Sequence, residues 1–209
     1  MASRPAWTIR DNKIVIDHFD FKWNGGFSVV QKQKNIVALH ESIKEKHNSE
    51  VLEVSSKSEN ELGENIGAFN LKSGDYYLEN IFQAAKKYEN GGPFIDLLNV
   101  LPRDAKRDER HGTSGDLFSF IYKEEEWLLE PKTAFYDFIY IRTLVEAHGK
   151  EIDLAPFQWF TDIEFNPKKS INCQARSVVI YKLLKQLDKF YLLESKDKWI
   201  EFHKQYVVG

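Results

Sequence analysis

Residues 76–88 read YYLENIFQAAKKY, and this stretch decides how the whole sequence is interpreted. As a helix, it places Glu79, Gln83 and Lys86 at spacings of four and three, so the three side chains share one face. Another face carries an apolar stripe that can pack on a core, formed by Leu78, Ile81, Phe82 and Ala85. A carboxylate, an amide and an ammonium in one row suit a ribose and a phosphate, but such rows also occur on solvated helix faces. The periodicity leaves both interpretations open.

The composition indicates a chain that folds on its own. It has 209 residues, of which 42% are hydrophobic and 14% aromatic, and its formal net charge is −3. A chain of this length buries roughly 70% of the surface that its unfolded form exposes. The small negative charge does not indicate a general nucleic-acid binder, so phosphate contacts must come from local basic clusters. We expect one domain over residues 1–209.

Cysteine and histidine usage argues against a metal or cofactor site. Cys173 is the single cysteine, which excludes an internal disulfide and a cysteine-based metal cluster. The six histidines show no ligand spacing, and the sequence has no P-loop and no GxGxxG motif. It also has no signal-peptide pattern and no apolar run that suits a membrane span. We therefore expect a cytoplasmic protein without a metal, a cofactor or a membrane association.

Patterns in the first half predict short strands separated by helices. Residues 13–22 begin with β-branched alternation, as a half-buried strand does, and 51–56 form a second strand candidate. Ser28 starts a capping-box pattern, which predicts a helix from there to about residue 47. The helix over the opening stretch is expected to end at Asn-Gly-Gly-Pro, residues 90–93, since glycine adopts the left-handed cap geometry and proline cannot continue a helix.

The second half is expected to be helical, apart from an irregular segment over 157–169 that contains a proline. Helix starts are predicted at Pro102, at Thr133, at Ser170 or Asn172, and at Ser195. Taken together, these patterns predict a mainly α, single-domain fold with a few short β-strands, mostly near the N-terminus.

One helix start is a candidate anion site. Lys168 and Lys169 precede the helix that begins near Asn172, and Gln174 and Arg176 lie in its first turn. A helix N-terminus presents free amides and the positive end of the helix dipole, and flanking lysines add charge. The alternative is that Asn172 only caps the helix.

The order of these elements resembles the NADAR family, whose fold is called YbiA-like. Residues 62–71 (LGENIGAFNL), followed by the opening stretch, are similar to the family's glycine and Asn-Phe turn and its Glu-His-Tyr-Phe-Gln-x-x-Lys helix. Asn80 stands where the family usually has histidine. Ala105-Lys106-Arg107 resembles an alanine and Gly-Arg segment, and DIEFNP over 162–167 resembles Leu-Val-Glu-x-x-Pro. The resemblance covers about 62–187, which leaves an N-terminal extension over about 1–60 and a terminal helix over 188–209.

The resemblance implies a hydrolase that cleaves the N-glycosidic bond between ADP-ribose and a nucleobase. Such a reaction develops positive charge at C1′ of the ribose and needs help for the departing nitrogen. Glu79 is our candidate for stabilising C1′ and activating water, and Glu164 is the second carboxylate. A lysine that attacks C1′ is the alternative, and the candidates are Lys57, Lys32 and Lys34.

Ligand contacts follow from the same resemblance. We expect Lys106, Arg107 and Arg176 to hold the diphosphate, Asn70 and Gln83 to bind ribose hydroxyls, and Phe69 to stack on a base. The complete set of expected ligand-binding residues is Lys32, Lys34, Phe69, Asn70, Asn80, Gln83, Lys86, Lys106, Arg107, Asn172, Gln174 and Arg176.

The extended form is similar to the branch that accompanies DarT-type toxins, which attach ADP-ribose to DNA guanine. This similarity implies an antitoxin that acts on an ADP-ribosylated nucleobase or single-stranded DNA, releases ADP-ribose, and is paired with an ADP-ribosyltransferase toxin. Two alternatives remain: an N-glycosidase for small ribosylated metabolites such as riboflavin-pathway intermediates, and a non-catalytic ADP-ribose-binding module.

Overall fold

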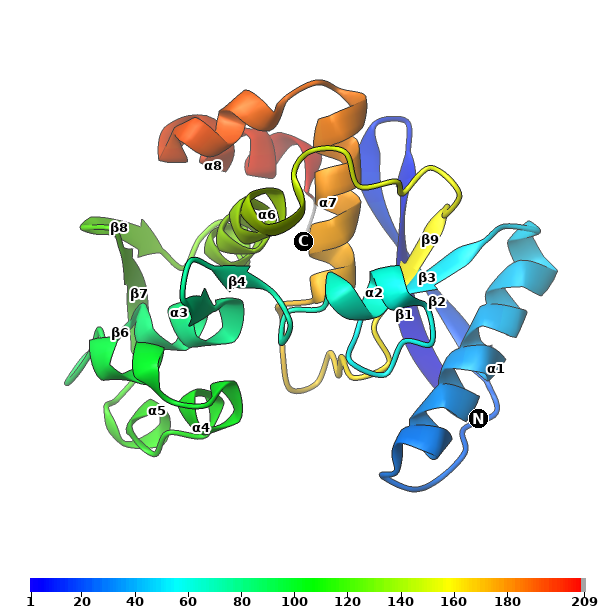
Figure 1. The fold of residues 1–209 in the computed structure, drawn as a ribbon, viewed down its shortest axis with the longest axis horizontal. Coiled ribbons are helices and arrows are strands. Elements are labelled where there is room, and N and C mark those ends of the chain that lie inside the picture. The colour runs from blue at the N-terminus through cyan, green and yellow to red at the C-terminus, as the bar shows by residue number, and fades with distance from the viewer. Residues whose placement is uncertain (208–209) are drawn as a thin grey trace.

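The computed structural model of the chain describes residues 1–207 as helices arranged with two main sheets (Figure 1). In chain order the elements are β1 (Ala2–Arg10), β2 (Lys13–Phe21), α1 (Val29–His47), β3 (Val51–Glu53), α2 (Glu61–Asn65), β4 (Lys72–Ser73), β5 (Tyr76–Tyr77), α3 (Leu78–Ala84), β6 (Lys86–Tyr88), η1 (Ile95–Asn99), α4 (Pro102–Lys106), α5 (Arg110–Thr113), β7 (Leu117–Tyr122), β8 (Glu125–Leu128), α6 (Ala134–His148), β9 (Trp159–Thr161), α7 (Gln174–Gln186), η2 (Phe190–Glu194) and α8 (Lys196–Tyr206). The two 3₁₀ helices are η1 and η2. No helix within residues 1–207 is both long and apolar enough to cross a membrane.

The first sheet joins the start of the chain to a segment near its end. Its strand order is β2-β1-β9-β3, in which β9 runs antiparallel to β1 and parallel to β3. Asp11 and Asn12, both with positive φ, make the tight turn of the β1–β2 hairpin. Helix α1 covers one face, where its Leu39 and Ile43 belong to the same buried cluster as Trp159 of β9. Residues near 160 are thereby held against the first sixty residues.

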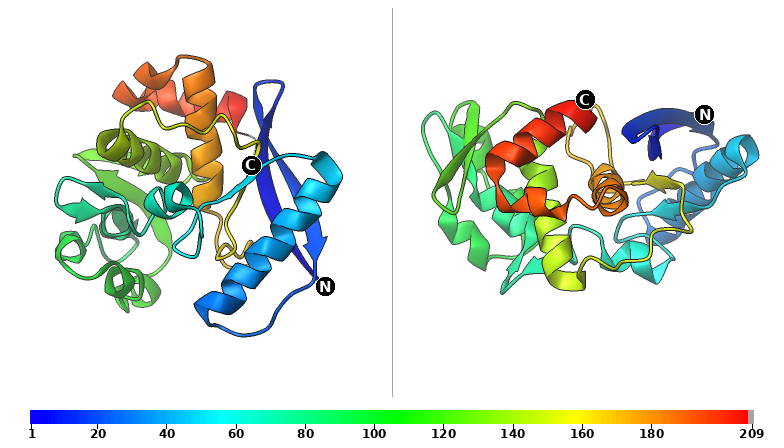
Figure 2. Two further views of the ribbon diagram at one scale, coloured as in Figure 1. Left: turned by 45° about the vertical axis from the view of Figure 1, so that its right-hand side comes forward. Right: turned by 90° about the horizontal axis from the view of Figure 1, so that it is seen from above.

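The second sheet, β6-β7-β8, lies on the other side of two central helices. Seen from above, α6 and α7 stand between this sheet and the β1–β2 hairpin (Figure 2). The main buried cluster spans all of these layers: Phe120 of β7 and Trp127 of β8 join Phe135 of α6, Val179 of α7 and Trp7 of β1. The core therefore fixes both sheets to the same helix pair.

The expectation of a mainly α fold is wrong. The chain is 43% helical and 20% strand, an α/β fold, and its strands continue beyond the N-terminal region. The β7–β8 hairpin shows why the pattern failed. Its turn is formed by Lys123 and Glu124, which have φ of 49° and 65°, although such turns usually carry glycine or asparagine. The turn therefore has no sequence signature.

Two further strands escaped prediction for local reasons. Pro5 lies within β1, opposite His18 of β2, but β1 pairs with β9 only at Trp7, so the proline removes no ladder hydrogen bond there. β9 has only three residues and lies in the segment that was expected to be irregular. Its strand conformation is imposed by pairing with β1 and β3, which are distant in sequence.

The opening stretch forms a shorter helix than expected. α3 ends after Ala84, and Lys86 already belongs to β6, which pairs with β7. The neighbouring strand thus supplies hydrogen bonds that further helical turns would otherwise make.

Several helix starts are confirmed. Ser28 accepts a hydrogen bond from the Gln31 amide at the start of α1, and Ser195 does the same for Lys198 in α8. Pro102 is the first residue of α4. α7 begins at Gln174 with Cys173 as its N-cap, so neither Ser170 nor Asn172 caps it.

Candidate functional site

A cavity of about 970 Å³ lies between α3, the loop after β8, and the segment that leads into α7. Residues 128–133 form one side, and residues 164–172 form another. Glu79, Gln83 and Lys86 of the opening stretch all line it. The row that the periodicity left ambiguous therefore faces a cavity and not bulk solvent.

Glu79 and Gln83 form a hydrogen-bonded pair in the cavity wall. Glu79 is 5% exposed, and its Oε1 accepts a hydrogen bond of 2.8 Å from Gln83 Nε2. The ammonium of Lys106 lies 3.8 Å from the same oxygen. Gln83 Oε1 is buried and has no partner within residues 1–207, so the amide offers an unused acceptor at the cavity.

Lys86 reaches the cavity from β6, and its surroundings favour the neutral amine. Burial lowers the pKa of this lysine to about 8, and the charge of Lys106 acts in the same direction, while Glu79 opposes the shift. Its Nζ also lies 5.2 Å from the centre of the Phe82 ring. A lysine with a lowered pKa is a potential nucleophile near neutral pH.

Lys106 and Phe69 form a cationic and aromatic edge to the cavity. Lys106 Nζ lies 5.3 Å from the centre of the Phe69 ring, and both residues line the cavity. Phe69 is 39% exposed, which leaves an aromatic ring accessible to a flat ligand.

Another part of the cavity wall carries the predicted anion site. Lys168, Lys169 and Asn172 line the cavity just before the first turn of α7. Gln174 also lines it, and its Oε1 accepts a hydrogen bond of 2.8 Å from the Ala68 amide, which ties α7 to the turn before α3. Glu164, on the same wall, makes an ion pair of 3.0 Å with Lys32 of α1.

Asp162 begins the DIEFNP segment, but the sequence assigned it no role. The residue is 6% exposed and is among those that line the cavity, and burial together with the charge of Glu53 raises the pKa of its carboxyl to about 8. Glu53, the only acidic residue in β3, was also not predicted as a functional residue. A glutamate in an otherwise apolar strand is the sequence feature that could have indicated it.

Comparison with known protein families gave a match over nearly the whole chain. Residues 2–208 match the family described as the DarT1-associated NADAR antitoxin. The chain belongs to this family. A search of curated proteins found no match. The family match includes the first sixty residues, so the N-terminal extension is part of this NADAR branch, and the family description pairs such antitoxins with a DarT1 toxin.

Two expected ligand-binding residues of this NADAR protein have internal partners. Arg176 is 9% exposed and binds Asp137 through its Nη2, at 2.9 Å, in the interior. Asn80 is fully buried, and its Nδ2 donates to the carbonyls of Leu97 and Val100 at 2.6 and 2.8 Å. Neither is among the residues that line the cavity, so the structure gives both a packing role around η1 and α7.

Five other expected residues also lie outside the cavity wall: Lys32, Lys34, Lys57, Asn70 and Arg107. Lys57 Nζ donates to Ser56, and Asn70 Nδ2 donates to the Glu64 carbonyl, both at 2.8 Å. Lys34 and Arg107 are exposed. Lys32 contacts the wall only through Glu164. Their assigned contacts with a ligand stay predictions.

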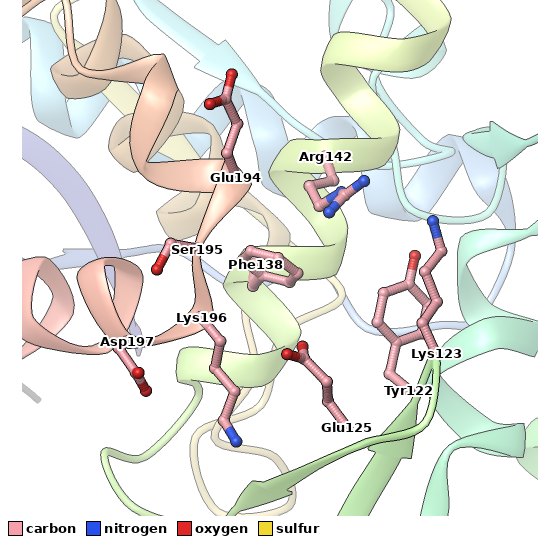
Figure 3. A pocket seen from close by; sticks show the side chains of 9 residues that line it. All are labelled: Tyr122, Lys123, Glu125, Phe138, Arg142, Glu194, Ser195, Lys196 and Asp197. Atoms are coloured by element: carbon pink, nitrogen blue, oxygen red, sulfur yellow. The ribbon is translucent and has the colours of Figure 1, made fainter.

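A second, smaller cleft of about 400 Å³ lies between the β7–β8 turn, α6 and the start of α8 (Figure 3). Its lining alternates in charge, with Lys123, Arg142 and Lys196 among Glu125, Glu194 and Asp197. Charges of both signs leave it without a clear preference for an anion or a cation. None of the residues that the sequence predicted to act in catalysis or ligand binding is among those that line this cleft.

Proposed function

We propose that this NADAR protein hydrolyses the N-glycosidic bond between ADP-ribose and a nucleobase, and removes ADP-ribose from guanine in DNA as the antitoxin of a DarT1 toxin. The observation that carries the proposal is the cavity itself. One part of the wall presents a carboxylate, an amide and a lysine with a lowered pKa, and another part presents two lysines in the segment that leads into α7. At about 970 Å³ it falls within the usual range for small-molecule sites, roughly 300 to 1,000 Å³.

The two parts of the wall suit the two ends of ADP-ribose. Lys168, Lys169 and the amides at the start of α7 would bind the diphosphate, because a helix N-terminus and flanking lysines favour anions. Gln83 Oε1, which has no partner in the described chain, would accept a hydrogen bond from a ribose hydroxyl. Phe69 would stack on a base at the edge of the cavity.

Glu79 is the proposed group at C1′. Its carboxylate would stabilise the positive charge that develops there as the C1′–N bond breaks. It would then take a proton from the water that attacks C1′, while the departing nitrogen gains a proton from an acid. The products are ADP-ribose and the free base. Gln83 and Lys106 hold the carboxylate in place.

Lys86 offers a second route to the same products. Its neutral amine would attack C1′ and displace the base, and the opened sugar would form an imine that water hydrolyses to ADP-ribose. Of the lysines considered, Lys86 combines a place on the cavity wall with a lowered pKa. It is therefore a better candidate than Lys57.

The test is release of free ADP-ribose from an oligonucleotide that carries ADP-ribosylated guanine, followed by mass spectrometry. We expect the Glu79→Gln variant to lose at least about 10²-fold in rate, the usual scale for loss of a general base. Glu125→Gln, in the smaller cleft, is the matched control and should keep the wild-type rate. Turnover by Glu79→Gln at the wild-type rate would exclude this mechanism.

The same assay separates the alternatives. A ribosylamino-pyrimidine phosphate that is cleaved in preference to the oligonucleotide would indicate a metabolite N-glycosidase, and binding without any cleavage would indicate a reader. Reduction with cyanoborohydride during turnover tests the imine. It should attach the sugar to the wild-type protein but not to Lys86→Met, and an adduct elsewhere would assign the lysine differently.

A further inference from the structure

Glu53 is a buried carboxylate whose polar partners are all uncharged. It is 2% exposed in β3. Its Oε1 accepts hydrogen bonds from Ser55 Oγ at 2.7 Å and from the Ile163 amide at 2.8 Å, and its Oε2 accepts one from Thr161 Oγ1 at 2.7 Å. Three donors favour the ionised form of this carboxyl even though burial opposes it.

Asp162 lies between the two residues of its own segment that bind Glu53. Its Oδ1 accepts hydrogen bonds from the amides of Glu164 and Phe165, at 3.0 and 3.2 Å. Its Oδ2 lies 4.0 Å from the thiol sulfur of Cys173. The residue also lines the large cavity. One carboxyl oxygen is therefore fixed by the backbone, and the other faces groups at the start of α7.

Within residues 1–207, no positively charged group is among the main influences on either carboxyl. His40 Nε2 lies 2.9 Å from Thr161 Oγ1, but burial lowers the pKa of this histidine to about 4 and keeps it neutral. The other titratable groups that act on Asp162 or feel its charge are acids: Glu53, Glu164, Cys173, Tyr136 and Tyr140.

Two buried acids of this kind cannot both ionise easily, because like charges in a low dielectric repel. The hydrogen bonds that Glu53 accepts, at 2.7 and 2.8 Å, are shorter than the two that Asp162 accepts from the backbone, at 3.0 and 3.2 Å, and this difference favours the charge on Glu53. Burial and the charge of Glu53 then raise the pKa of Asp162 to about 8. The result is a protonated carboxylic acid on the cavity wall near neutral pH, a state suited to giving a proton away.

We propose that Asp162 is the general acid that protonates the nitrogen of the departing base, and that Glu53 is the positioning residue that keeps Asp162 protonated. This inference rests on the proposed N-glycosidase function. As the C1′–N bond breaks, its electron pair stays on nitrogen, which takes the proton of Asp162. Water adds to C1′ and gives a proton to Glu79. Solvent then returns one proton to Asp162 and accepts one from Glu79.

The first test is Asp162→Asn, assayed with the ADP-ribosylated oligonucleotide. Asparagine keeps the acceptor for the two backbone amides but has no acidic proton. We expect kcat to fall about 10²-fold or more, the usual scale for loss of a general acid, while the Kd for ADP-ribose stays within about threefold. Glu125→Gln serves again as the control, and circular dichroism checks the fold.

The second test is the pH profile of Glu53→Gln. In the wild type, kcat/KM should decline above about pH 8 as Asp162 loses its proton. Removing the neighbouring charge should move this decline at least one unit toward lower pH. If the decline came from another cavity group, such as Lys86, the Glu53→Gln substitution would not move it to lower pH.

These outcomes separate the two proposals. If the wild type releases no ADP-ribose, the proposed function fails. If it does release ADP-ribose and Asp162→Asn keeps the rate, or if Glu53→Gln leaves the alkaline decline in place, the role of Asp162 is excluded and the N-glycosidase function stands.

Discussion

Two buried acidic clusters of this protein differ in whether a positive charge is present. Asp137 of α6 is fully buried and accepts hydrogen bonds from Arg176 and Ser177 of α7, at 2.9 and 2.6 Å, and lies 3.0 Å from His203 of α8. Burial alone would raise the pKa of Asp137, but the charge of Arg176 and the hydrogen bonds from His203 and Ser177 outweigh it and lower the pKa.

The Glu53–Asp162 pair is the opposite case. Both carboxyls are buried, their partners are uncharged, and burial raises the pKa of each. The Asp137 cluster joins three helices in the interior, whereas Asp162 lies at the cavity. The difference indicates that Asp137, which has a positively charged partner, stabilises the fold. Asp162, which has none among its partners in residues 1–207, stays protonated and can donate its proton.

The largest expected effect comes from breaking the compensated cluster. Asp137→Asn leaves the charge of Arg176 buried without its counter-ion, and such changes typically cost about 3 to 5 kcal/mol. Urea unfolding at neutral pH measures the loss, with the exposed Glu59→Gln as the control. A loss below about 1 kcal/mol would show that Arg176 finds another partner and that the cluster does not hold the helices.

A second prediction uses the opposite pH dependence of the two acids. The folded-state pKa of Asp162, about 8, lies above its unfolded value near 3.8, so the folded state binds more protons between these pH values. Stability should therefore fall as pH rises from about 4 to 8, by up to about 1.4 kcal/mol per pH unit. Asp162→Asn should remove this slope, as measured by urea midpoints across the range.

The same experiment should show the reverse for Asp137. Its folded-state pKa lies below the unfolded value, so its contribution is present above about pH 4 and is lost as pH falls further. Asp162→Asn should leave this acid limb unchanged. If Asp162→Asn changed the stability both below pH 4 and between pH 4 and 8, the two clusters would be coupled.

The smallest effect is expected at the surface of the cavity wall. Lys32 and Glu164 form an ion pair at 3.0 Å, with side chains that are 19% and 42% exposed. Solvent screens such pairs, so Lys32→Met should cost no more than about 1 kcal/mol. The difference from wild type should shrink further at 1 M salt in the same unfolding assay. A loss of several kcal/mol that does not depend on salt would show that this ion pair stabilises the fold as strongly as the buried Asp137 cluster.

Prediction from sequence succeeded where neighbouring residues decide the structure. The Ser28 and Ser195 caps are hydrogen bonds across three residues, and Pro102 suits a first helical position by its own ring geometry. The spacing of four placed Glu79 and Gln83 on one helix face, and their side chains form a hydrogen bond there across one helical turn. Such contacts require no knowledge of the rest of the chain.

Prediction failed where distant segments decide. The β7–β8 turn uses two non-glycine residues with positive φ, and β9 is a strand only because it pairs with β1 and β3. The hydrogen bond between Thr161 and Glu53 joins residues 108 positions apart. Sequence periodicity cannot indicate a pair so far apart, so the sequence assigned no role to Asp162, the cavity residue whose pKa Glu53 raises.

The sequence by itself determined the Ser28 and Ser195 helix caps, the placement of Glu79 and Gln83 on one helix face, and the order of motifs that resembles the NADAR family, because each depends on spacing along the chain. Only the tertiary structure decided which polar residues meet. It brought Lys86 to the cavity from a strand and directed Arg176 inward to Asp137. It also set Asp162 beside Glu53. Burial and the charge of neighbouring groups determine the protonation of these side chains, and both arise only when the two sheets close on α6 and α7.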